Sequence, residues 1–76
     1  MPTAFILINV EAGSEEQVIR ELKTIDKIKN VYFVYGVYDI VAKVEAETQL
    51  GVKETITWKI RKIEKIRSTQ TLMVSS

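Results

Sequence analysis

Two short stretches of this 76-residue chain carry residues that could do chemistry. The first, Gly36-Val37-Tyr38-Asp39, puts a carboxylate just after a turn between two β-branched, apolar runs. A tight hairpin needs only its turn residues, such as Asn-Gly or Asp-Gly. Asp39 therefore either satisfies backbone groups near the turn or meets a positive charge that assembly brings to it. Gly36 would let a ligand or another backbone come close.

The second stretch, Thr69-Gln70-Thr71, supplies small polar groups that could help line a site shared with Asp39. Side chains alternate across an extended segment, so the two threonines share one face and Gln70 has the other. Which threonine would face such a site stays open.

The composition excludes the usual catalytic sites. The chain has no histidine and no cysteine, which removes Ser–His and Cys–His pairs, disulfides and thiolate metal sites. No segment matches a phosphate-binding or dinucleotide-binding loop. The other carboxylates are explained by helix starts, loops and solvated surfaces. We expect no enzyme activity, no cofactor and no metal.

Size and charge favour an oligomer in the cytoplasm. A single domain of 76 residues buries too little apolar surface for a robust core, and without disulfides or a structural metal it usually needs oligomerisation. The net charge of +1 gives no general reason to bind nucleic acid or membranes. The apolar run at residues 4–10 is too short to span a bilayer and lacks the flanks of a signal peptide.

The hydrophobic pattern predicts the order β-α-β-β-α-β. A capping box, Ser14 with Gln17, should begin the first helix. This order is that of an α+β, ferredoxin-like fold, in which a four-stranded antiparallel sheet carries two helices on one face. We expect strands at residues 3–10, 31–35, 39–46 and 67–74, helices at 15–25 and 52–63, and a polar connection at 26–30 that contains one buried residue, Ile28.

The other face of this sheet should not be polar. Residues 4–8 and 31–35 are apolar on both strand faces, whereas a half-covered sheet normally alternates. We therefore expect dimerisation through the open sheet face, with Asp39 pointing toward that face or its rim. Trp58 lies off the apolar stripe of the second helix and is either a cover for the core edge or an oligomer contact.

Nucleic-acid binding is the weaker alternative. RNA-recognition motifs have the same strand order but stack bases on aromatic residues of the third strand, and residues 39–45 here contain none. The excess of Lys and Arg over residues 53–67 could contact a nucleic acid. The simpler interpretation is that these cations compensate the helix dipole on a solvated face.

Three segments together resemble the effector-binding half of the Lrp/AsnC family, called the RAM domain. They are AFILINVEAG, the turn VYGVYD at residues 34–39, and STQTLMV at residues 68–74. The resemblance covers residues 1–76 in order. Because Met1 leads almost directly into the first strand, the chain is most similar to stand-alone RAM proteins that lack the helix-turn-helix DNA-binding domain.

The resemblance implies what this chain does. It implies sheet-paired dimers that join into rings, commonly octamers, with amino-acid effectors bound between dimers. The implied site comprises Gly36, Val37, Tyr38, Asp39, Thr69, Gln70 and Thr71. In it Asp39 would pair with the α-ammonium of the effector, and the backbone amides of residues 36–38 would receive its carboxylate.

We therefore expect an amino-acid-sensing and assembly module linked to transcriptional regulation, without direct DNA binding. Co-assembly with full-length regulators of the family is one way it could act. Position 37 is often polar or charged in the family and is Val37 here. A purely structural oligomer with a vestigial pocket is accordingly the alternative.

Overall fold

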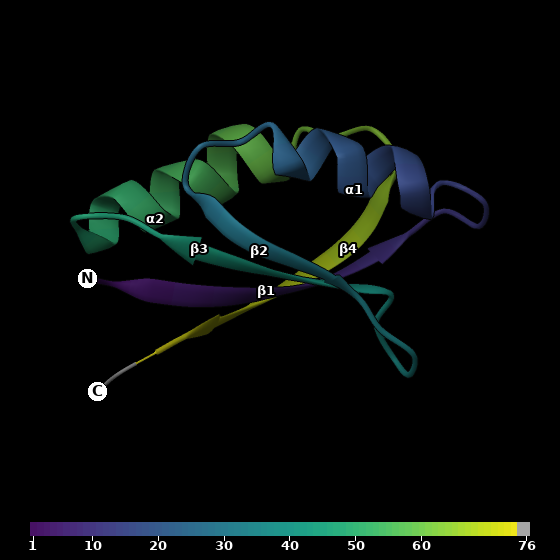
Figure 1. Ribbon diagram of the computed structural model, residues 1–76, viewed down its shortest axis with the longest axis horizontal. Coiled ribbons are helices and arrows are strands. Elements are labelled where there is room, and N and C mark those ends of the chain that lie inside the picture. Colours follow the sequence, from purple (N-terminus) through teal and green to yellow (C-terminus); the bar gives the residue numbers. More distant parts are fainter. Residues whose placement is uncertain (75–76) are drawn as a thin grey trace.

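A four-stranded sheet and a layer of helices over one of its faces make up the protein (Figure 1). The computed structural model describes residues 1–74. The elements are β1 (Thr3–Val10), α1 (Glu15–Lys23), β2 (Ile28–Phe33), β3 (Ile40–Glu45), α2 (Gln49–Thr55), the π-helical segment η1 (Ile56–Ile60) and β4 (Ile66–Met73). The β-α-β-β-α-β order and the antiparallel sheet predicted from the sequence are confirmed.

The sheet has the strand order β2-β3-β1-β4, and each neighbouring pair is antiparallel. Along β1, every second residue is buried beneath the helices, beginning with Ala4. Ile40, Ala42 and Val44 of β3 are fully buried on the same face, as the sequence predicted. The two central strands thus form the floor of the core.

The helix α1 closes one half of this core with Val18 and Leu22, both fully buried. The predicted capping box is wrong: the Ser14 side chain makes no capping hydrogen bond, and Ser14 does not have the extended backbone that such caps use. Its backbone carbonyl accepts from the Val18 N–H instead (3.0 Å). The helix ends at Lys23, two residues earlier than expected.

The second helix begins three residues before the predicted start at residue 52. Thr48 caps it, because its hydroxyl oxygen accepts from the Gly51 N–H at 3.0 Å. After Thr55 the helix widens into η1, and the Arg61 N–H donates to the carbonyl of Ile56. Trp58 lies on this segment and is 67% exposed, so it does not cover the core edge.

The strand β2 begins at Ile28, inside the stretch expected to be a polar connection. Ile28 pairs with Val44 and is buried, as its apolar character predicted. The polar residues beside it are tolerated because β2 is an edge strand with solvent on one side. β1 has the predicted bounds, and the other strand ends differ from prediction by one or two residues, a normal uncertainty. The helical structure after α2 ends at Ile60, three residues before the predicted end at residue 63.

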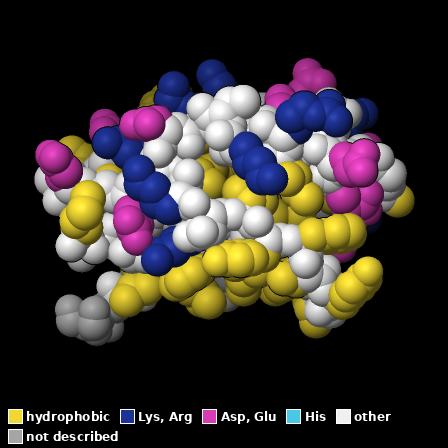
Figure 2. Space-filling view, in the orientation of Figure 1, with side chains coloured by type: hydrophobic (Ala, Val, Ile, Leu, Met, Phe, Trp, Pro, Cys, Tyr) yellow, Lys and Arg dark blue, Asp and Glu magenta, His cyan; other side chains and the backbone are white. Residues whose placement is uncertain are grey.

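The sheet face without helices, called the open face below, is largely apolar. Its positions alternate with the buried ones on each strand and include Phe5, Leu7, Tyr32, Val41 and Leu72. Hydrophobic side chains accordingly gather beneath the sheet, along the lower edge of the view in Figure 2. Among the residues described, no helix is long and apolar enough to cross a membrane.

Candidate functional site

The turn between β2 and β3 is an exposed loop closed at its base. The Val34 N–H donates to the carbonyl of Asp39 at 2.9 Å. Gly36 has a positive φ of 139°, which L-residues with side chains rarely adopt, so glycine is required there for conformational reasons. Val37 is 84% exposed at the tip. The predicted site residues Gly36 and Val37 therefore project into solvent in the single chain.

Asp39 fastens this turn to the end of β1. Its Oδ2 accepts from the Val10 N–H at 3.0 Å, and its own N–H donates to the carbonyl of Ile8 at 3.0 Å. This arrangement matches the simpler of the two sequence interpretations, in which Asp39 satisfies backbone groups near the turn. Within residues 1–74 the second carboxylate oxygen has no hydrogen-bond partner, so the anion keeps capacity for a cationic ligand.

Tyr38 and Gln70 bring the two predicted stretches together. The Tyr38 hydroxyl donates to Gln70 Oε1 at 2.9 Å. Because β1 lies between β3 and β4, this bond crosses β1. Gln70 pairs with Leu7 and therefore belongs to the open face. The turn and the last strand thus share a polar contact on that face.

The two threonines lie on the opposite face from Gln70. Thr69 pairs with Ile8 and Thr71 with Ile6, and both isoleucines point into the core. The sequence left open which threonine faces the site. In the structure both threonines are partly buried on the helix-covered face, and neither lies on the open face with Gln70.

A cavity of about 320 Å³ lies beside Asp39. Its other lining residues are Asn9, Val10, Arg67 and Ser68, and the Asn9 side-chain amide donates to Ser68 Oγ at 3.3 Å. The cavity contains one carboxylate and one guanidinium, which is the charge pattern of a receptor for a zwitterion. Sequence reasoning missed its polar wall, although Asn9 is a conspicuous polar residue in the apolar run of β1.

A larger groove of about 660 Å³ lies elsewhere, between α1 and the end of the second helix. Arg20, Lys59 and Lys62 line it, but Glu21 and Glu64 lie among them. This mixture of charges does not make the uniformly basic surface that nucleic-acid binding needs. The smaller cavity is the better candidate because it adjoins Asp39 and is lined by a single carboxylate and a single guanidinium among uncharged residues.

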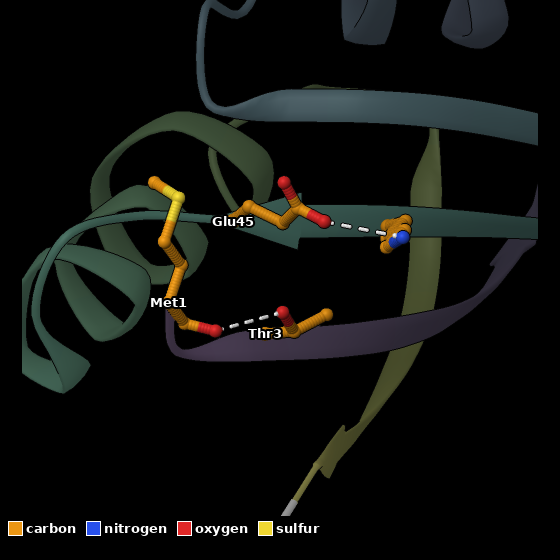
Figure 3. Close-up of polar contacts among 4 residues, drawn as sticks. Met1, Thr3 and Glu45 are labelled. Carbon is orange, nitrogen blue, oxygen red and sulfur yellow. Dashed lines mark hydrogen bonds and ion pairs between the residues drawn. The ribbon is translucent and has the colours of Figure 1, made fainter.

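Charged groups also occur on the open face, near the end of the sheet away from the turn. Lys43 Nζ and Glu45 Oε2 form an ion pair at 3.1 Å, with both side chains about two-thirds buried (Figure 3). Nearby, the Thr3 hydroxyl donates to the carbonyl of Met1 at 3.2 Å. The open face is thus apolar in its middle and polar toward each end.

Metal-binding groups are not clustered. Among residues 1–74, no three carboxylates lie close enough together to hold a metal ion.

Comparison with known proteins identifies the family. Residues 3–76 match the model of the Lrp/AsnC ligand-binding domain. The regulatory protein AsnC of Haemophilus influenzae is 33% identical over 67 residues, which are 88% of this chain and 45% of that protein. A helix-turn-helix-type transcriptional regulator of Pyrococcus abyssi is 33% identical over 73 residues, or 96% of this chain and 46% of its own length.

Solved structures agree with the sequence relatives. FFRP-DM1 superposes with a TM-score of 0.94 at 41% identity, with 99% of this chain and 100% of that chain covered. The hypothetical protein PHS023 of Pyrococcus horikoshii gives 0.93 at 41% identity, with 100% and 92% covered. This chain spans about half the length of the curated regulators but nearly all of these two structures. The chain therefore belongs to the Lrp/AsnC family, a regulatory and non-enzymatic family, and its residues 3–76 form the ligand-binding domain.

Proposed function

We propose that this domain senses a free amino acid at the turn end of its sheet and does so as an oligomer. The observation that carries the proposal is the placement of Asp39 beside a cavity, on a domain of the Lrp/AsnC ligand-binding type. One carboxylate oxygen accepts from the Val10 N–H, which fixes the side chain, while the other has no hydrogen-bond partner within residues 1–74 and can accept from an ammonium group. A charge-assisted hydrogen bond of this kind contributes about 1.5–3 kcal/mol.

An amino acid is the effector class that fits a regulatory domain of this kind. A structurally similar transcriptional regulator of Neisseria meningitidis, NMB0573, is known as a complex with L-Met; it shares 10% identity and a TM-score of 0.88 with this chain. At that identity only the fold carries over, so the chemical identity of the side chain that this domain selects is a matter for experiment.

The open face supports assembly through paired sheets. Tyr32 and Leu72 are each about half exposed there, and they continue the apolar surface of Phe5 and Leu7. Each 100 Å² of apolar surface removed from water contributes roughly 2.5 kcal/mol before the costs of association. We propose that dimers form by this face and join into a ring, with an octamer as the expected size. Co-assembly with full-length regulators would then connect the domain to transcription.

Calorimetry with each of the twenty standard L-amino acids tests the sensing function. Asp39→Asn keeps an oxygen that can accept from Val10 N–H but removes the charge. We expect it to weaken binding by about tenfold to a hundredfold, the loss of one charged hydrogen bond. Asp26→Asn, at an exposed aspartate on the connection before β2, is the matched control and should bind as the wild type does.

Two results would contradict the proposal. If Asp39→Asn binds as tightly as the wild type, Asp39 is not part of the site. If no amino acid binds at millimolar concentration, the alternative of a structural oligomer with an empty pocket is favoured. Native mass spectrometry with and without amino acids reports the ring size and the bound mass in one measurement.

A further inference from the structure

Arg67 occupies an irregular position in β4. Asn9 pairs with Ser68, but the next residue of β1, Val10, pairs with Ile66, so Arg67 has no partner across the strands. An extra residue of this kind is a β-bulge, which turns a side chain out of the regular alternation and often occurs beside functional sites. The bulge therefore directs an exposed arginine away from the pattern of its strand.

This bulge lies at the wall of the 320 Å³ cavity, where Arg67 and Asp39 are lining residues. The two side chains do not form a direct ion pair, because the single ion pair within 4.0 Å in residues 1–74 joins Lys43 and Glu45. A cation and an anion thus share one small cavity without direct contact. A ligand that carries both charges could contact both.

We propose that Arg67 receives the carboxylate of a zwitterionic α-amino acid whose ammonium group pairs with Asp39. This inference rests on the proposed sensing function and adds to it a residue that selects for a free α-carboxylate. A guanidinium can bind a carboxylate through two parallel hydrogen bonds. In this proposal the Arg67 guanidinium binds the carboxylate of the effector, a role that the resemblance to the family assigned to the backbone amides of residues 36–38.

The same charges restrict the class of ligand. A dicarboxylic acid without an amino group would be attracted by Arg67 but repelled by Asp39. A simple amine would be attracted by Asp39 but repelled by Arg67. Only a molecule with adjacent opposite charges satisfies both groups. The neutral Asn9 and Ser68 complete the wall, and their mutual hydrogen bond leaves further capacity on each for the ligand.

Substitution at position 67, combined with a change in the ligand, tests this subsite. The probes are the twenty L-amino acids and their α-carboxamides, measured by calorimetry against the wild type and Arg67→Gln. In the wild type, the amide of the bound amino acid should bind at least tenfold more weakly. In Arg67→Gln the amino acid should lose about tenfold to a hundredfold in affinity, and the preference over the amide should disappear.

Two further variants separate a specific role from general effects. Arg61→Gln removes an exposed arginine that does not line the cavity, and it should leave binding unchanged. Arg67→Lys keeps the charge but not the planar fork, so its affinity should fall between those of the wild type and Arg67→Gln. Circular dichroism and native mass spectrometry establish that fold and assembly are the same in all variants.

The possible failures are distinguishable. If wild type binds an amino acid and Arg67→Gln binds it equally well, with the same preference over the amide, the carboxylate is received elsewhere and the Arg67 subsite is wrong. The sensing function would survive that result. If the wild type binds none of the twenty amino acids, both proposals fall.

Discussion

Replacing Leu72 with lysine tests whether the open face is covered in solution. Leu72 lies opposite Phe5 on that face and is 48% exposed in the single chain. If the face is free, the substitution should be neutral or slightly favourable, because it removes exposed apolar surface. If a second copy covers the face, the substitution should weaken the dimer. A free face therefore predicts an unchanged or slightly more stable protein, whereas a covered face predicts weaker dimerisation.

The size of the effect follows from the exposed fraction. Full burial of a leucine side chain is worth about 1.5–3 kcal/mol, and roughly half of that, about 1 kcal/mol, is still available at Leu72. A two-fold dimer contains the residue twice, so about 2 kcal/mol is lost, which raises Kd about 30-fold. The desolvation of an unpaired ammonium group adds to this.

Analytical ultracentrifugation over a range of concentrations measures this shift. Leu50→Lys is the matched control, because Leu50 is 65% exposed on α2, in the helix layer on the other side of the sheet. We expect the control to dimerise as the wild type does. The reasoning is refuted if Leu72→Lys sediments like the wild type across the range, or if the wild type itself is a stable, folded monomer at micromolar concentration.

Two further predictions concern the elements that hold the site. Gly36→Ala should lower the free energy of unfolding by about 1–3 kcal/mol through backbone strain, because φ at this position is +139°. Steric clash adds nothing, since a new Cβ would meet no atom within 4 Å. An unchanged Tm would contradict this prediction. Thr48→Ala should cost about 1 kcal/mol by removing the cap of α2. It should lower Tm by about 4–8 °C in a domain of this size, whereas Thr57→Ala, on the exposed side of η1, should change it little.

The order of elements could be predicted because each has its own local signal. Alternating burial in β1 and the spacing of Val18 and Leu22 in α1 are visible as hydrophobic patterns. The errors occur where tertiary context decides. Ile28 joins β2 because it pairs with Val44, 16 residues away, and Ser14 is not a side-chain cap because the chain enters α1 with a different backbone conformation.

The site was predictable only as two separate stretches. The alternation of side chains correctly separated Gln70 from Thr69 and Thr71, but the sequence could not say which face belonged to the turn. That answer comes from the register between β1 and β4 and from the hydrogen bond to Tyr38. The proposed role of Arg67 could not be predicted, because a bulge is a property of strand pairing. The sequence interpretation attributed the basic residues near the end of the helix to compensation of the helix dipole.

The position of the cavity connects the two parts of the proposed function. Asn9 and Ser68 pair on the open face, at the end of the same surface that carries Phe5 and Leu7. An assembly that covers this surface must come close to the cavity and can change its walls. If assembly tightens amino-acid binding by some factor, thermodynamic linkage requires the amino acid to tighten assembly by the same factor. Ligand occupancy would then be converted into a change of oligomeric state.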